Sequence, residues 1–177
     1  MRLSLLVVMA TAALAAGCQL FSAEQARAVA DLAPTRGHAA AGTVTFEQFG
    51  DRVHLHAEVT GLRPGGEHGF HVHEHGDCSS GDGASAKGHF NPFGKPHAHY
   101  STPERHAGDL PSLKADAQGR AVLNVQLDVI TVVTGPAGIV GRGLIVHEAA
   151  DDYRTQPAGN SGARIACGVI RRAPKAN

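Results

Sequence analysis

Short stretches of alternating apolar and polar residues make up most of the chain after residue 40. AGTVTFEQFG (41–50) and DRVHLHAEVTGL (51–62) alternate around a Gly-Asp pair, which is typical of a β-hairpin. No long stretch in this part of the chain has helical periodicity. Further strands are predicted in GEHGFHVHE (66–74), AVLNVQLDVITVV (121–133), GLIVHE (143–148) and ARIACGVIRR (163–172). Several short strands with glycine turns between them favour an all-β sandwich or barrel.

Two stretches interrupt this pattern. From Cys78 to about Pro111 we predict no strand, and EAADDYRTQPAGNSGAR (148–164) is a second irregular stretch. Loops of this length inside a compact domain usually serve a function. We therefore expect two long functional loops on a β-framework.

The N-terminus differs from the rest of the chain. Arg2 precedes a 14-residue apolar run (3–16), and LAAGC (14–18) follows the small-residue pattern of a secretory signal. A cysteine directly after Ala-Ala-Gly resembles a bacterial lipoprotein signal, in which Cys18 is lipidated and becomes the first mature residue. Ordinary signal cleavage is the alternative. We expect a lipoprotein signal peptide in residues 1–17, a lipidated N-terminus and flexible tether in 18–36, and one domain in 37–177.

Composition adds two constraints. The formal net charge is zero, which gives no argument for a nucleic-acid partner, and the 12 histidines are a first indication of metal binding. If Cys18 carries lipid, Cys78 and Cys167 remain as a pair, and an oxidising compartment favours their disulfide. On the chain-entropy model, closing so long a loop contributes roughly 4–5 kcal/mol.

Histidines gather in one strand and in the first loop. His71 and His73 lie two residues apart, so in a strand both rings point to the same face. His54 and His56 share this spacing, and we expect them on a solvated strand face, so the spacing alone is weak evidence. Three histidines and one carboxylate suit a tetrahedral zinc site, and residues 88–110 of the loop offer four histidines and one aspartate, although a loose metal-scavenging loop would look similar. Its candidate ligands are His89, His97, His99, His106 and Asp109.

Five stretches of the chain resemble the copper–zinc superoxide dismutases of the bacterial exported type. They occur in the order typical of that family and cover essentially all of residues 40–172. The resemblance implies a Greek-key β-sandwich or flattened barrel with a zinc and disulfide loop and an electrostatic loop. The matching stretches are GFHVHEHGDC (69–78), GHFNP (88–92), ERHAGDL (104–110), GLIVHEAADD (143–152) and GNSGARIACGVI (159–170).

The resemblance also implies a role for each site residue. It implies one copper and one zinc per subunit, with His89 as an imidazolate that bridges both metals. Asp151 matches a carboxylate that links a copper histidine to a zinc histidine, and Arg164 matches the arginine beside the copper. Cys78 and Cys167 match the disulfide of the family. The implied copper ligands are His71, His73, His89 and His147, and the implied zinc ligands are His89, His97, His106 and Asp109.

The chemistry of these residues agrees with such roles. Imidazole suits copper in both of its oxidation states, whereas zinc does not change oxidation state and can hold geometry and charge. When copper is reduced, the bridge at His89 can open on the copper side and take up a proton. The guanidinium of Arg164 can attract and orient a small anion. Asp151 can fix the tautomers of the histidines that it contacts.

The implied activity is dismutation of superoxide to dioxygen and hydrogen peroxide by a lipid-anchored periplasmic enzyme. A non-catalytic exported protein that stores copper or zinc is the alternative, and an inactive structural relative is a further one. The sequence leaves both a monomer and a homodimer open, and His97 is preferred to His99 as a zinc ligand on spacing. We expect the remaining histidines at the surface without a fixed metal, namely His38, His54, His56, His68, His75 and His99.

Overall fold

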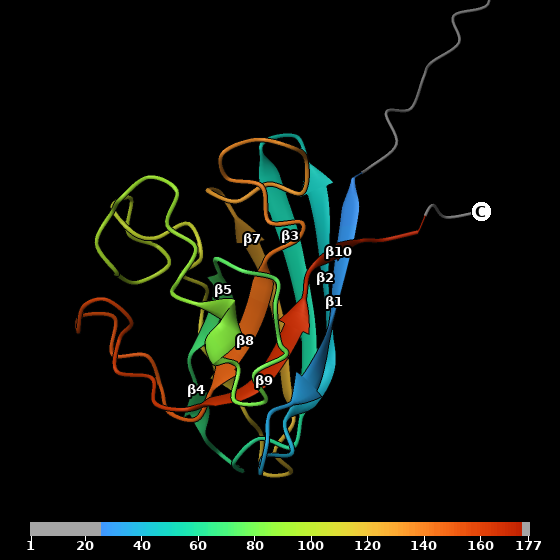
Figure 1. The fold of residues 1–177 in the computed structure, drawn as a ribbon, viewed down its shortest axis with the longest axis vertical. Coiled ribbons are helices and arrows are strands. Elements are labelled where there is room, and N and C mark those ends of the chain that lie inside the picture. The colour runs from blue at the N-terminus through green and yellow to red at the C-terminus, as the bar shows by residue number, and fades with distance from the viewer. Residues whose placement is uncertain (1–25, 175–177) are drawn as a thin grey trace, which may run out of the picture.

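The computed structural model describes residues 26–174 (Figure 1). The predicted signal peptide (1–17) and Cys18 lie outside this range. The described residues form ten β-strands and one turn of 3₁₀-helix, Ala84–Ala86, and none of them belongs to a helix able to cross a membrane. The strands are β1 Arg27–Pro34, β2 Ala41–Phe49, β3 Arg52–Thr60, β4 Glu67–His68, β5 Phe70–His73, β6 Leu113–Lys114, β7 Ala121–Leu127, β8 Gly143–His147, β9 Arg164–Val169 and β10 Arg171–Arg172.

Eight strands form one antiparallel sheet that curls around the core (Figure 1). Its order is β5-β8-β9-β1-β2-β3-β7, with β10 paired to β1, while β4 and β6 form a separate pair. Strands distant in sequence are therefore neighbours, as in a Greek-key arrangement. This architecture confirms the predicted all-β flattened barrel, and it brings β5 and β8 together on the side that carries the two long loops.

Alternating burial explains why the predicted hairpin forms. Val53, Leu55, Ala57 and Val59 of β3 are fully buried, whereas the residues between them reach the surface. The chain reverses at Gly50, whose φ of 57° favours glycine. The hairpin of β2 and β3 is thus confirmed, and its inner face contributes to one continuous hydrophobic core.

The prediction of a flexible tether over residues 18–36 was wrong for Arg27–Pro34, which form β1. This strand pairs with β2, β9 and β10, and so belongs to the folded domain. Ala28, Ala30 and Leu32 alternate toward the core and are at most 4% exposed. Alanine is a weak strand former, so the local residue pattern does not predict that tertiary pairing makes this segment a strand.

Other boundaries also differ from the prediction. The run 66–74 divides into β4 and β5 at Gly69, where a Cβ atom would lie 2.6 Å from Oγ of Ser161. The strand predicted for 121–133 ends at Leu127. The irregular character of both predicted loops is confirmed, with the single 3₁₀ turn inside the first and β6 just beyond it. The two loops lie on the side of the barrel formed by β5 and β8 (Figure 1).

Candidate metal centre

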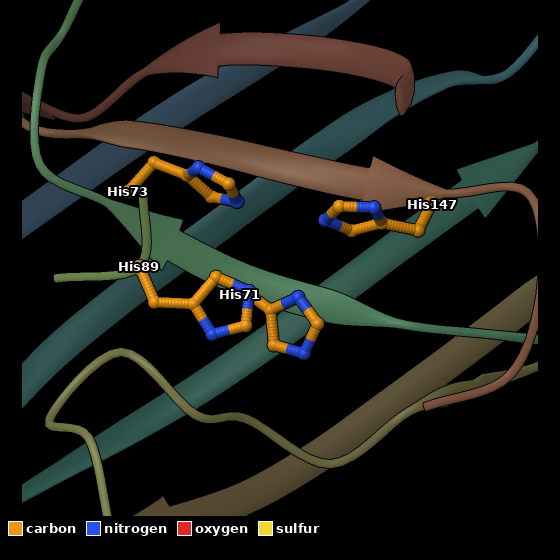
Figure 2. A group of neighbouring side chains, drawn as sticks. All are labelled: His71, His73, His89 and His147. Carbon is orange, nitrogen blue, oxygen red and sulfur yellow. The ribbon is translucent and has the colours of Figure 1, made fainter. Parts of the chain in front are cut away.

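Two groups of buried side chains converge beside β5 and β8. Within each group the candidate ligand atoms all lie within 4.8 Å of one another. His89 belongs to both groups, so its ring lies between them. The first group is His71, His73, His89 and His147, shown in Figure 2, and the second is His89, His97, His106 and Asp109.

The sheet register positions the first group. His71 and His73 occupy alternate positions of β5 and share a face. His147 ends the neighbouring strand β8, where Val146 pairs with Phe70. The loop returns to the same place because an isolated bridge joins His89 to His73. Two strands and one loop residue thus place four rings around a common space (Figure 2).

Each ring of the first group has one buried nitrogen without a hydrogen-bond partner among residues 26–174. These atoms are Nδ1 of His71 and Nε2 of His73, His89 and His147. Burying a polar atom without a partner is costly, and four such atoms in one place indicate that they face a bound cation. Four imidazole nitrogens suit copper or zinc.

The opposite nitrogens are held by fixed acceptors. The Nδ1–H of His73 donates to the carbonyl oxygen of Lys87 at 2.8 Å, and that of His147 donates to Gly162 at 3.2 Å. Nε2 of His71 lies 2.7 Å from Asp151. Such contacts fix the tautomer and direct the free nitrogen of each ring inward.

The second group surrounds one carboxylate oxygen. Oδ1 of Asp109 lies 3.0 Å from Nδ1 of His89, 3.0 Å from Nδ1 of His97 and 3.4 Å from Nδ1 of His106. Nδ1 of His106 and Nδ1 of His89 are 3.4 Å apart. Ligands bound tetrahedrally at about 2.0–2.1 Å are separated by roughly 3.3 Å. The donor set and its spacing fit zinc.

Asp151 joins the two groups. Its two oxygens contact Nε2 of His71 at 2.7 Å and Nε2 of His97 at 2.9 Å. Burial opposes ionisation of this carboxyl, but hydrogen bonds from His71 and His97 outweigh it and hold the pKa of Asp151 well below its usual range. Asp151 is thus an ionised acceptor for one ring of each group.

Burial sets the charge state of three rings of the first group, those of His73, His89 and His147. It lowers the pKa of His89 to about 4 and that of His147 to about 3, and it holds the pKa of His73 well below its usual value. These rings are therefore neutral at pH 7, as metal ligands must be. Burial also acts to lower the pKa of His97. Hydrogen bonds to Asp109 and Asp151 outweigh this effect and raise the pKa of His97 to about 9.

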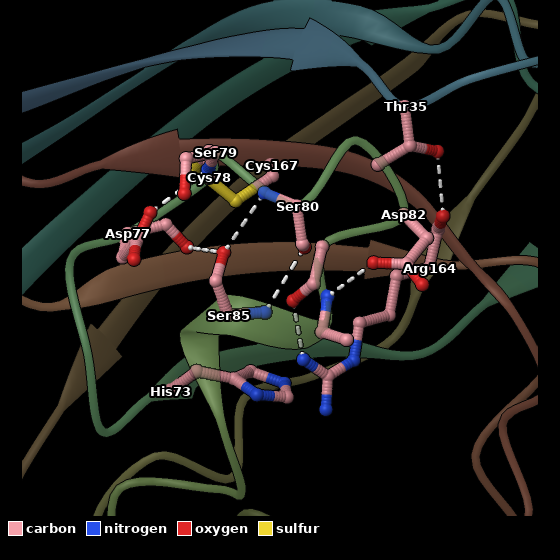
Figure 3. Close-up of a disulfide and its surroundings, with 12 residues drawn as sticks. Thr35, His73, Asp77, Cys78, Ser79, Ser80, Asp82, Ser85, Arg164 and Cys167 are labelled. Atoms are coloured by element: carbon pink, nitrogen blue, oxygen red, sulfur yellow. Dashed lines mark hydrogen bonds between the residues drawn. A yellow bond between two sulfur atoms is a disulfide. The ribbon is translucent and has the colours of Figure 1, made fainter.

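Arg164 lies opposite His147 in the ladder of β8 and β9. Its guanidinium, which Figure 3 shows beside the disulfide loop, donates to the carbonyl oxygens of Gly83 at 2.5 Å and Lys87 at 2.6 Å. Lys87 also accepts the hydrogen bond from His73, so one carbonyl connects the arginine to the first group. Burial lowers the pKa of Arg164 from its ordinary value, which lies far above neutral pH.

The predicted disulfide between Cys78 and Cys167 is present, which confirms the pairing. It ties the start of the first loop to β9, three residues beyond Arg164. The loop between Cys78 and Lys87 is held further by the hydroxyl of Ser85, which donates to the backbone carbonyl oxygen of Asp77 at 2.8 Å (Figure 3). The loop segment that supplies both carbonyl partners of Arg164 is thereby fixed to the strand that carries the arginine.

The structure resolves the choice between neighbouring histidines. His97 lies in the second group, whereas His99 packs between the rings of Tyr100 and Tyr153, and neither His99 nor His75 joins either group of described residues. The prediction that His68 is a surface residue was wrong. Its side chain is 1% exposed, and Nδ1 lies 2.8 Å from the carbonyl oxygen of His147. One feature of the sequence indicated this burial. His68 precedes Phe70 by two residues and Val72 by four, and both of these side chains face the core.

Comparison with known proteins points to one family. The family model for copper/zinc superoxide dismutase (SODC) matches residues 40–170. A Cu-Zn superoxide dismutase of Aquifex aeolicus is 38% identical over 149 residues, which cover 82% of this chain and 86% of that protein. The Cu-Zn superoxide dismutase of Deinococcus radiodurans is 41% identical over 144 residues, 73% of this chain and 76% of that protein.

A solved structure extends the likeness to three dimensions. The crystal structure of the clock protein EA4 matches this fold with a TM-score of 0.77 and 40% sequence identity, covering 85% of this chain and 96% of that one. The matched residues 40–170 include every member of both side-chain groups, as well as Arg164 and the disulfide. By sequence and by fold, the chain belongs to the copper/zinc superoxide dismutase family.

Proposed function

We propose that the first side-chain group holds copper and the second holds zinc in an enzyme that converts superoxide to dioxygen and hydrogen peroxide. The four inward-facing nitrogens without partners, on His71, His73, His89 and His147, carry this assignment. Copper bound there supplies one-electron oxidation of one superoxide and one-electron reduction of the next. Zinc at His89, His97, His106 and Asp109 supplies fixed charge and geometry.

The residues around the copper position have separate tasks. Nε2 of His89 faces the first group while Nδ1 faces the second, so His89 is placed to hold a proton at Nε2 for the second half-reaction. Arg164 is held at Gly83 and Lys87, and its charge attracts and orients the anionic substrate. Asp151 keeps one ring of each group in place.

Arg164→Ala tests the catalytic proposal against simple metal storage. Storage needs the histidines but no arginine beside them. We expect the variant to keep the copper and zinc content of the wild type, measured by elemental analysis, and to consume superoxide several-fold more slowly. Arg172→Ala, on β10, is the control. An unchanged rate in Arg164→Ala would favour storage.

We also propose that the protein is exported and anchored by lipid at Cys18, with residues 1–17 removed. The sequence LAAGC (14–18) and the Cys78–Cys167 disulfide, which persists in oxidising compartments, support a periplasmic location. With Ala26 and β1 in the folded domain, the proposed tether shortens to residues 18–25. Mass spectrometry of the mature protein should find an acylated N-terminal Cys18. An unmodified N-terminus at another residue would contradict the anchor.

A further inference from the structure

A second pair of histidines lies outside both buried groups, on the outer face of β3. His54 and His56 alternate with fully buried apolar residues, so both rings project from the side of the sheet turned away from the core. Glu58 is the next residue on that face. Three side chains with nitrogen or oxygen donors therefore follow one another along a single strand.

A hydrogen bond fixes the tautomer of His56. Its Nδ1 lies 2.8 Å from Oδ1 of Asn124, on the neighbouring strand β7. An amide oxygen can only accept, so the ring must donate from Nδ1. A neutral imidazole has one N–H, and this leaves the lone pair of His56 at Nε2. Ligating histidines are commonly oriented by such a contact at the opposite nitrogen.

The lone pair of His56 faces a carboxylate. Nε2 lies 3.4 Å from Oε1 of Glu58, and the two side chains are 38% and 50% exposed. The other oxygen of Glu58, Oε2, accepts a hydrogen bond from Arg120 at 2.9 Å, which orients the carboxylate and leaves Oε1 for a further partner. Two acceptors that face each other repel unless a cation lies between them. Their separation equals that of neighbouring ligands around tetrahedral zinc, roughly 3.3 Å.

His54 supplies a third donor. It pairs with Glu47 of β2 and Gln126 of β7, and it precedes His56 by two residues on the same face. Residues so spaced on a strand lie about 6–7 Å apart. The ring nitrogens of His54 do not lie within 4.8 Å of both other donors, so its half-buried side chain must turn toward a shared ion to bind it.

We propose that His54, His56 and Glu58 form a surface site for a divalent transition-metal ion such as Zn²⁺ or Cu²⁺. Mixed imidazole and carboxylate donors suit these ions, and water completes the coordination. The site is separate from the buried groups and does not depend on the reaction proposed there. Because it is open to solvent, its ion exchanges with the surrounding solution.

Zinc uptake by the copper- and zinc-loaded protein tests this site. The loaded protein is dialysed against ZnCl₂, and bound zinc is counted by elemental analysis. We expect the wild type to bind one zinc per chain more than the double variant His54→Gln/His56→Gln. His38→Gln removes an exposed histidine elsewhere and should keep the additional zinc. Copper content and dismutation rate should stay unchanged in all three proteins.

A second variant tests metal binding at this site without removing any of the three proposed ligands. Asn124→Leu keeps His54, His56 and Glu58 but removes the acceptor for Nδ1, so we expect zinc affinity at this site to fall several-fold. Gln126→Leu, on the same strand and the same face, is the matched control. Absence of additional zinc in the wild type, or equal uptake in the double variant, would overturn the proposal. The contact between His56 and Glu58 would then be bridged by a proton.

Discussion

At the scale of single residues, hydrogen bonds at the outer nitrogens of several histidine rings orient ligands of the metal centre. His71 and His97 rest on Asp151, and His73 and His147 rest on backbone carbonyls. Their free nitrogens are therefore directed inward by contacts that belong to the protein itself. Asp151 contacts one ring of each group.

Asp151→Asn should weaken both metal sites. His71 and His97 contact different oxygens of Asp151, and an amide replaces one of these oxygens with an NH₂ donor, so one of the two hydrogen bonds is lost. Loss of such outer contacts typically costs about 10–100-fold in metal affinity, measured as copper and zinc retained against a competing chelator. Asp116→Asn, in a surface turn, is the control. Retention equal to that of the wild type would contradict this role of Asp151.

His68→Phe should destabilise the fold although His68 is not a ligand. The substitution leaves the carbonyl oxygen of His147 without its buried partner. Loss of a partner for a buried polar group typically costs about 1–3 kcal/mol, measurable by urea unfolding. A free energy of unfolding equal to that of the wild type would show that this contact contributes nothing.

The predicted site residues came from motif resemblance rather than from spacing. The pair His71 and His73 and the pair His54 and His56 look alike in the sequence. Only the fold shows that the first pair is buried and the second projects outward. His68 was missed because its buried partner, the carbonyl oxygen of His147, is distant in the sequence.

At the scale of elements, the hairpin of β2 and β3 followed from alternation of large apolar residues, but β1 did not. Its inward side chains are mainly alanines, and its partners β2, β9 and β10 are mostly distant in sequence. The pattern of apolar and polar residues within one segment does not indicate which distant segments will pair with it.

Truncation tests the assignment of β1 to the domain. A chain that begins at Ala26 should fold, whereas one that begins at Gly37 should lose cooperative thermal unfolding. The shorter chain exposes the edges of β2 and β9 and removes Leu32 from the core. Circular dichroism during heating measures the difference. Equal midpoints for both chains would restore the tether interpretation.

The disulfide should matter for stability and for activity. We expect Cys78→Ser/Cys167→Ser to lower the free energy of unfolding by about 2–5 kcal/mol. The rate per bound copper should also fall, because the loop that supplies Gly83 and Lys87 to Arg164 is no longer tied to β9. Urea unfolding and a superoxide assay measure the two effects. A full rate per copper would limit the disulfide to a purely stabilising role.

At the scale of the whole molecule, the metal-free protein should be most stable near pH 6–7. His89 and His147 have folded pKa values of about 4 and 3, below the ordinary 6.5, so acid favours the unfolded chain and their contribution is lost as pH falls below 6.5. His97 has a folded pKa of about 9, so its contribution is lost as pH rises from 6.5 to 9. The midpoint of urea unfolding, measured from acid pH up to pH 9, tests both the loss of stability below pH 6.5 and the loss above it. A midpoint that rises steadily to pH 9 would contradict the role of His97.

The fold as a whole brings two loops and two strands to one centre, and the central claim is that this centre dismutates superoxide. The most direct measurement is the rate of superoxide consumption by the mature protein loaded with copper and zinc. We predict a rate constant approaching about 10⁸–10⁹ M⁻¹ s⁻¹, the diffusional limit that superoxide dismutases are known to reach. A protein that binds both metals but consumes superoxide no faster than free copper would contradict the account.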